Sequence, residues 1–247
     1  MSFANRSPFA LLTLAASFAF LTAACGGDGP SAPVIERGPV ILLGDGQTED
    51  SIALILTEAG IPFEMAGPYW EYDGGGLDTA SAAILLTGYD YLEEMPEAAQ
   101  HAVVAFVEAG GGLMTTEWML YNLYYEFDAQ SIVAAIAPAV YLDDYDYEGE
   151  EYKRLMPGHP VAQGLPATFS TSGDWTWILT APDPAPAKQA QVVFGGESSG
   201  AAVIAGVHGQ GRTVHWAMAG EYNGSDIWSM DVRKLLVNIV SYISKRT

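Results

Sequence analysis

The strongest constraint on the fold is an alternation between short, wholly apolar segments and longer amphipathic ones. Residues 39–43 and 82–86 are uninterrupted apolar runs, and a glycine follows each within two residues. Such a run is typical of a strand that is buried on both faces of a parallel sheet. Residues 52–59 and 96–108 place apolar side chains at helical spacing. This order predicts a flavodoxin-like α/β fold, a parallel sheet with right-handed connections and helices on both faces.

The remaining elements follow from the same patterns. Further strands are expected at residues 61–66, 113–116, 175–179, 191–194, 201–207 and 212–218, and a last helix at residues 231–243. Gly209 and Gly211 separate the last two strands and predict an antiparallel hairpin as a C-terminal extension of the sheet. The stretch from Tyr141 to Lys153 is rich in Asp, Glu and Tyr and is interpreted as a surface excursion. We expect a single domain over residues 38–247.

Composition narrows the possible functions. Apolar residues make up 49% of the chain, enough to bury a sizeable core. The chain carries 30 acidic and 10 basic residues, a formal net charge of −20. Nucleic acids and anionic lipid head groups both require clustered Lys and Arg, so we exclude nucleic acid as a partner and expect no electrostatic docking on a bilayer. The acidity is otherwise typical of a device that keeps a protein soluble.

The first 24 residues have the pattern of an export signal. Arg6 is followed by an apolar run over residues 9–21, which is shorter than the roughly 20 residues that a membrane span needs. Small residues then precede Cys25, and this arrangement resembles the lipobox of bacterial lipoproteins, with Thr22 where Leu is commoner. The alternative is an ordinary cleaved signal with a cysteine near the cut.

Cys25 is the only cysteine in the chain, so it cannot form an internal disulfide. We therefore expect a palmitate-type acyl anchor on Cys25 and a flexible Gly- and Pro-rich tether over residues 25–37. The protein is then a lipoprotein of the bacterial cell envelope, attached to the lipid bilayer outside the cytoplasm. Gly26 stands where some inner-membrane lipoproteins have Asp, which favours the outer membrane.

Four stretches together resemble a known superfamily. They are the glycine-rich passage at residues 106–113, Gly-His-Pro-Val-Ala-Gln-Gly-Leu at residues 158–165, the hairpin at residues 207–214, and Leu-Leu-Val-Asn-Ile at residues 235–239. In this order they resemble the class I glutamine amidotransferase-like superfamily, and within it the trehalose-utilisation (ThuA-like) group. The resemblance spans residues 40–243 and implies the same flavodoxin-like fold.

The residues that perform amidotransfer in that superfamily are missing here. Its enzymes place a cysteine on the sharp turn after the strand that corresponds to residues 113–116, where the start of a helix lowers the thiol pKa. This chain has Thr116-Glu117-Trp118 there, and no cysteine after residue 25. The His-Pro-Glu sequence that supplies their base is replaced by Gly220-Glu221-Tyr222. Thiol-dependent amidotransfer is therefore excluded.

Acidic and aromatic residues follow several of the expected strands. Ligands of open parallel sheets bind at the carboxyl ends of the strands, so side chains in these positions are candidates for one site. The candidates for ligand binding are Asp45, Tyr69, Trp70, Asp90, Glu117, Trp118, Glu221 and Tyr222. Carboxylates beside flat rings suit a carbohydrate, and oxygen ligands also suit Ca2+. The alternative is that loops at strand ends are polar in any acidic protein.

Three functions remain open at this stage. The leading hypothesis is a non-catalytic envelope module that binds carbohydrate or a similar polar ligand. The second is a glycosidase-like hydrolase with Glu117 and Glu221 as acid and base. The third is a scaffold that contacts other envelope proteins.

The acidic residues and histidines lack the spacing of known metal-binding motifs. Asp143 to Glu151 lacks the spacing of a calcium loop, so a solvated acidic loop is favoured. No two histidines have zinc-site spacing, and no catalytic metal is expected. His159 precedes a proline in a turn that it is expected to stabilise, and His208 and His215 lie on the two arms of the expected hairpin, where they are candidates for close approach.

Overall fold

The computed structural model describes residues 38–44, 49–88, 93–125, 130–171, 176–219 and 228–244, with only the backbone described at 145–148 and 177. The chain divides into two units, residues 1–35 and 36–247, and all described residues belong to the second. The export signal, Cys25 and the tether lie outside the described residues. No helix in the described ranges is both long and apolar enough to cross a bilayer.

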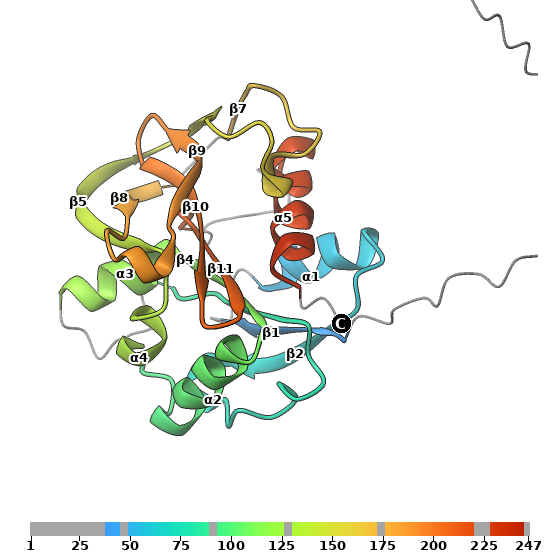
Figure 1. Cartoon of the computed structure of the whole chain (residues 1–247). Helices are drawn as coiled ribbons and strands as arrows, with labels where there is room; N and C mark the ends of the chain where they lie inside the picture. The colour runs from blue at the N-terminus through green and yellow to red at the C-terminus, as the bar shows by residue number, and fades with distance from the viewer. Residues whose placement is uncertain are drawn as a thin grey trace, which may run out of the picture. The chain divides into compact units, whose positions relative to one another are not determined.

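Five parallel strands form the first half of the sheet (Figure 1). They are β1 (Val40–Gly44), β2 (Phe63–Pro68), β3 (Ala82–Leu85), β4 (Gly112–Thr116) and β11 (Gly211–Trp216). Their order is β2-β1-β3-β4-β11, and every neighbouring pair in it is parallel. This is the flavodoxin-like arrangement, so the predicted fold class is confirmed.

The apolar runs form strands because both of their faces are covered. All residues of β1, β3 and β4 are buried. Alternate side chains enter opposite cores: Leu42 and Ile84 belong to one, and Ile41 and Ala83 to the other. An unbroken apolar run satisfies both cores at once.

Helices cover the two faces of this sheet (Figure 1). The terminal helices α1 (Glu49–Glu58) and α5 (Met230–Ile243) supply apolar side chains to the core that contains Leu42. Helices α2 (Glu97–Glu108), α3 (Glu117–Tyr124) and α4 (Ser131–Ala134) supply the opposite core. Prediction from the sequence located α1, α2 and α5, but neither α3 nor α4.

Antiparallel strands extend the sheet beyond β11. Strand β10 (Gly200–His208) pairs with β11, so the predicted hairpin is confirmed. Next come β9 (Gln191–Gly196), β6 (Glu151–Arg154) and β7 (Thr168–Ser170), each antiparallel to the strand before it. The parallel and antiparallel halves meet at β11.

The acidic stretch after residue 139 is a strand rather than a loop. Strand β5 (Ala139–Glu148) pairs antiparallel with β8 (Thr176–Pro182), and β6 follows at once, so the expected loop is wrong, although Leu142, Asp143 and Asp144 lie at the surface as predicted. Tyrosine has a high strand propensity, and an antiparallel strand can expose one face to water. Backbone hydrogen bonds to β8 therefore stabilise this strand, although it has few side chains to bury in a core.

The Gly-His-Pro segment packs on the last helix. His159 precedes the short 3-10 helix η2 (Pro160–Ala162), and its Nδ1 atom accepts the N–H of Val161 at 3.2 Å. Asn238 of α5 donates from Nδ2 to the carbonyl oxygens of Val161 and Gln163, at 3.0 and 2.9 Å. Burial lowers the pKa of His159, and the nearby Arg212 lowers it further. The predicted turn-stabilising role of His159 is confirmed.

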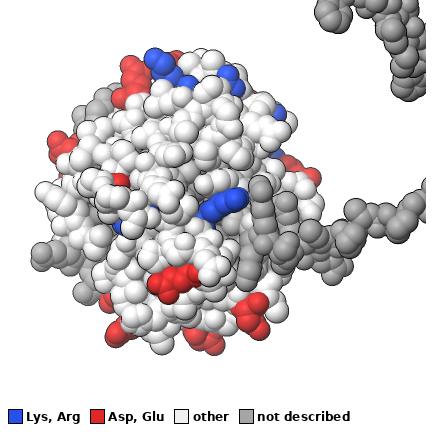
Figure 2. Space-filling view, in the orientation of Figure 1, with Lys and Arg blue, Asp and Glu red and all other residues white. Residues whose placement is uncertain are grey.

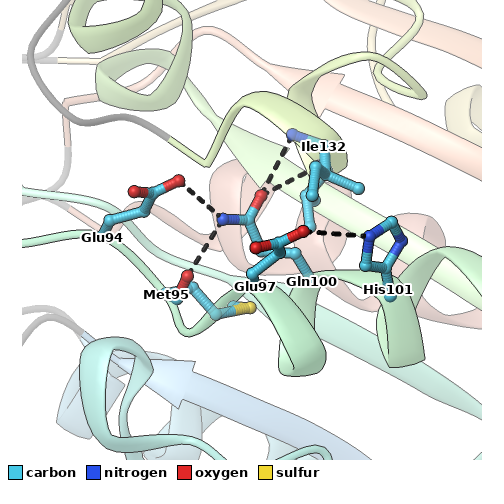
Figure 3. Close-up of polar contacts among 7 residues, drawn as sticks. Glu94, Met95, Glu97, Gln100, His101 and Ile132 are labelled. Atoms are coloured by element: carbon cyan, nitrogen blue, oxygen red, sulfur yellow. Dashed lines mark hydrogen bonds and ion pairs between the residues drawn. The ribbon is translucent and has the colours of Figure 1, made fainter.

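A buried glutamine holds α4 in place (Figure 3). The Oε1 atom of Gln100, on α2, accepts the N–H groups of Ile132 and Val133 at 3.0 and 3.3 Å, at the start of α4. Its Nε2 atom donates to the side chain of Glu94 and the carbonyl oxygen of Met95, at 3.0 and 2.9 Å. One side chain thereby serves as cap for a helix that has none of its own.

Candidate functional site

The carboxyl ends of β2, β1, β3, β4 and β11 lie along one edge of the sheet because these neighbouring strands are parallel. We call the residues that directly follow these ends the strand-end rim. Four candidates for ligand binding are described: Tyr69, Trp70, Glu117 and Trp118. The other four, Asp45, Asp90, Glu221 and Tyr222, lie outside the described residues.

Glu117 is the first residue of α3 and follows β4 directly. Its side chain is buried, and its Oε2 atom accepts a hydrogen bond from Oγ1 of Thr176 at 3.1 Å. The same hydroxyl lies 3.3 Å from the carbonyl oxygen of Ala217, just beyond β11. A hydroxyl has one hydrogen, so Thr176 donates to one of these oxygens at a time. Glu117 therefore takes part in holding β4, β8 and β11 together.

Buried threonines continue this polar interior. The N–H of Thr87, after β3, lies 3.4 Å from Oγ1 of Thr116. Oγ1 of Thr115 lies 3.1 Å from Nδ1 of His215 on the adjacent strand β11. Burial lowers the pKa of His215 to about 3, so its ring is neutral at ordinary pH.

The aromatic candidates differ in their exposure. Tyr69 and Trp118 are buried, and Trp70 is half-buried. The rings of Tyr69 and Trp70 meet edge to face at 5.0 Å, and those of Trp118 and Tyr121 at 5.2 Å. Of the four candidates that the structure describes, Trp70 alone has a partly exposed surface that a ligand can touch.

The hairpin histidines do not come together. His215 pairs with Ile204, whereas His208 pairs with Gly211 at the turn. Four residues of strand separate the two positions, about 13 Å. His208 instead lies 3.4 Å from Glu108. Within the described ranges, no three His, Cys, Asp or Glu side chains are grouped closely enough to hold a metal ion.

Carboxylates are scattered on the visible surface. Figure 2 shows acidic side chains at several separate places on one face, many of them near its margin, and basic atoms near its centre. Of the carboxylates predicted at the strand-end rim, Glu117 is the one that the described residues include, and it is buried. In this view the acidic composition is therefore a general surface property rather than one patch.

A tyrosine cluster beside α3 was not singled out from the sequence. The ring of Tyr124, at the end of α3, stacks on Tyr141 of β5 with centroids 4.1 Å apart. The hydroxyls of Tyr125 and Tyr141 both donate to Asp144, at 2.6 and 2.7 Å. The sequence signal was the paired Tyr124-Tyr125 together with the Tyr and Asp alternation after residue 140, which was interpreted as a solvated loop.

No family model matches the chain, and no curated protein matches it by sequence. Several solved structures do match the chain. A cytoplasmic protein from Salmonella typhimurium has 14% identity and a TM-score of 0.66, over 84% of this chain and all of that one. A ThuA-like protein from Bacteroides uniformis has 16% identity and a TM-score of 0.62, over 87% of this chain and 95% of that one.

A β-galactosidase from Rahnella contains the same fold as one part of a longer chain. It has 14% identity and a TM-score of 0.56, over 84% of this chain and 31% of that one. Identities at this level establish the architecture. The chain therefore has the ThuA-like form of the glutamine amidotransferase-like fold.

Proposed function

We propose that this chain is a non-catalytic module that binds carbohydrate or a similar polar ligand, held in the bacterial cell envelope by a lipid on Cys25. One observation carries the non-catalytic part. At the turn after β4, where enzymes of the resembling superfamily place their cysteine, the chain has a buried Glu117 that is hydrogen-bonded to Thr176. An acid or base must come within hydrogen-bonding reach of its substrate, and in this structure Glu117 presents no exposed oxygen to one.

Two observations support carbohydrate as the ligand. The same fold forms part of a protein named as a β-galactosidase. Surface aromatic rings lie beside carboxylates, as Tyr125 and Tyr141 do beside Asp144. Sugars match such surfaces because their C–H faces stack on rings while their hydroxyls bond to carboxylate oxygens.

A glycan array combined with thermal-shift measurements tests this function. We expect at least one saccharide to be captured and to raise the melting temperature. The screen includes Ca2+, because Asp45, Asp90 and Glu221 remain candidates for oxygen ligands. If no saccharide or divalent cation is bound, the proposal fails, and proteins that co-purify from detergent extracts become the test of a scaffold role.

An assay for glycoside hydrolysis distinguishes a binding module from a hydrolase. We expect chromogenic glycosides to remain intact in the presence of the protein. Hydrolysis that disappears in Glu117→Gln or Glu221→Gln would establish the hydrolase with these carboxylates as acid and base.

A further inference from the structure

We propose that the ligand site is a pocket between α3, α4 and β5, at the C-terminal end of α3 rather than at the strand-end rim, and that it takes one neutral saccharide unit. This inference rests on the proposed function and adds its location and ligand class. The pocket has a volume of about 350 Å3 and is lined by side chains that include Leu123, Tyr124, Ala135, Tyr141, Asp183 and Lys188. Ligand pockets span roughly 300–1,000 Å3, so this one suits a single small unit, free or at the end of a longer glycan.

The aromatic wall provides a flat surface that is held in place. Tyr124 stacks on Tyr141 with an interplanar angle of 25°, yet the residue is 60% exposed. Tyr141 covers one face of the Tyr124 ring, so the exposed area includes the other face. Asp144 ties Tyr141 to Tyr125, whose ring meets Tyr124 edge to face at 5.1 Å. A surface already fixed in position loses little freedom when a ligand binds.

One ion pair supplies the charged groups of the pocket. Nζ of Lys188 lies 2.6 Å from Oδ2 of Asp183, and both side chains are 15% exposed. Lys188 also donates to the carbonyl oxygen of Ala137 at 2.8 Å. The N–H of Ala185 donates to Oδ1 of Asp183 at 2.8 Å. An ammonium has three hydrogens and a carboxylate accepts about four bonds, so the pair has capacity to donate to and accept from a ligand.

The carboxyl group of Asp183 stays ionised in this environment. Burial by itself raises its pKa, but the hydrogen bonds from Lys188 and Ala185 and the charge of Lys188 outweigh burial and leave the pKa below its ordinary value. The pair thus has no net charge over the ordinary pH range.

These features together favour a neutral polyol with an apolar face. A net charge of −20 on the chain repels anions, and a cation competes with Lys188 for Asp183. A wholly apolar ligand leaves the remaining hydrogen-bonding capacity of the ion pair unmet, at a cost in free energy. A pyranose ring stacks its C–H face on Tyr124 and directs hydroxyls to both charged groups.

Isothermal titration of the full chain in detergent tests the site. The probes are neutral oligosaccharides of glucose, galactose or N-acetylglucosamine, with oligomers of glucuronic acid as charged counterparts. We expect at least one neutral series to bind and the glucuronic acid series to bind more weakly. Tyr124→Ala should weaken binding about 3- to 10-fold, the usual range for an aromatic contact, while Tyr124→Phe retains the ring and the affinity.

Two more variants make the outcomes distinguishable. Met230→Ala, on α5 and 80% exposed, is the matched surface control and should bind like the wild type. Trp70→Ala reports on the strand-end rim. If it weakens binding and Tyr124→Ala does not, the pocket is refuted while the proposed function stands. If no saccharide binds here or on the glycan array, and no divalent cation binds, the proposed function itself fails. Preference for glucuronic acid would refute the neutral ligand class.

Discussion

Single residues at the ends of β4 and β11 give this fold a polar interior where an enzyme would keep its reactive group. Thr176 is 59 positions from Glu117 in the chain, yet it bonds to that carboxylate inside the protein. Thr115 and His215 meet across adjacent strands in the same way. Each of these side chains has a hydrogen-bonding partner inside the protein, although the buried Nε2 atom of His215 has none among the described residues. Their substitution should therefore change stability more than binding.

Replacing Thr176 tests the bond to Glu117. Thr176→Val keeps the shape of the side chain and removes its hydrogen-bond donor. The loss of one hydrogen bond to a buried charged group costs about 1.5–3 kcal/mol, so we expect the free energy of unfolding to fall by that amount in urea denaturation. Thr176→Ser retains the hydroxyl and is the control. Equal stability of Thr176→Val and the wild type would show that the buried carboxylate does not need this donor.

His215 should make the fold sensitive to acid. Its folded-state pKa of about 3 lies below the ordinary 6.5. Between these two pH values the unfolded chain therefore binds a proton at this residue and the folded protein does not. This contribution to stability is complete above pH 6.5 and is lost as pH falls towards 3, by up to about 1.4 kcal/mol per pH unit.

Urea denaturation between pH 6.5 and 4 measures this dependence. His215→Gln removes the titrating ring. As the pH is lowered, we expect the free energy of unfolding of this variant to fall less steeply than that of the wild type. The difference in slope corresponds to the uptake of about one proton fewer on unfolding. The lowered pKa of His159 acts in the same direction in both proteins and cancels from the comparison. Identical slopes would mean that the folded protein admits the proton at His215.

Among the secondary-structure elements, α5 and β4 must approach each other closely. A Cβ atom at Gly112 would overlap the backbone carbonyl group of Ile243 at the end of α5. Helix α5 supplies Leu235, Leu236 and Ile239 to one core, so its displacement disturbs much of that face.

Gly112→Ala measures this approach. Overpacking typically costs about 1–3 kcal/mol, and we expect a loss of that size in the free energy of unfolding. At Gly158 a Cβ would have open space around it, so Gly158→Ala is the control and should unfold like the wild type. A neutral Gly112→Ala would show that α5 shifts without cost and does not pack as tightly on β4 as described.

Elements differ in how well the sequence predicts them. Strands β1 and β3 were identifiable because burial on both faces leaves an unbroken apolar run. Strand β5 was missed because its stability comes from pairing with β8, which local composition does not show. Helix α4 was missed because its cap is Gln100, about 30 residues earlier in the chain.

The candidate site was predictable to a similar extent. Topology correctly places Glu117 at the carboxyl end of β4. Its burial, and the burial of Tyr69 and Trp118, depends on residues from distant segments, so alternating patterns could not reveal it. The pocket with Tyr124, Tyr141 and the ion pair Asp183–Lys188 joins three separate parts of the chain, and no single motif encodes it.

At the scale of the whole molecule, attachment through Cys25 can be tested separately from ligand binding. Expressed in a bacterial host, the full chain should incorporate labelled palmitate, partition into the detergent phase and fractionate with the outer membrane. Cys25→Ser should take up no label and remain in the aqueous phase, because stable anchoring requires the acyl chains. An unmodified thiol on the wild-type protein would contradict the anchor.

The proposed function requires that this fold binds a saccharide without transforming it, and one measurement tests both properties. Ligand-observed saturation-transfer NMR is recorded on the full chain with a neutral oligosaccharide over a day. We expect transfer of saturation to the sugar protons, with anomeric signals that keep their positions and intensities. New anomeric signals that grow with time and vanish in Glu117→Gln would contradict it, as would the absence of saturation transfer for every neutral sugar tested.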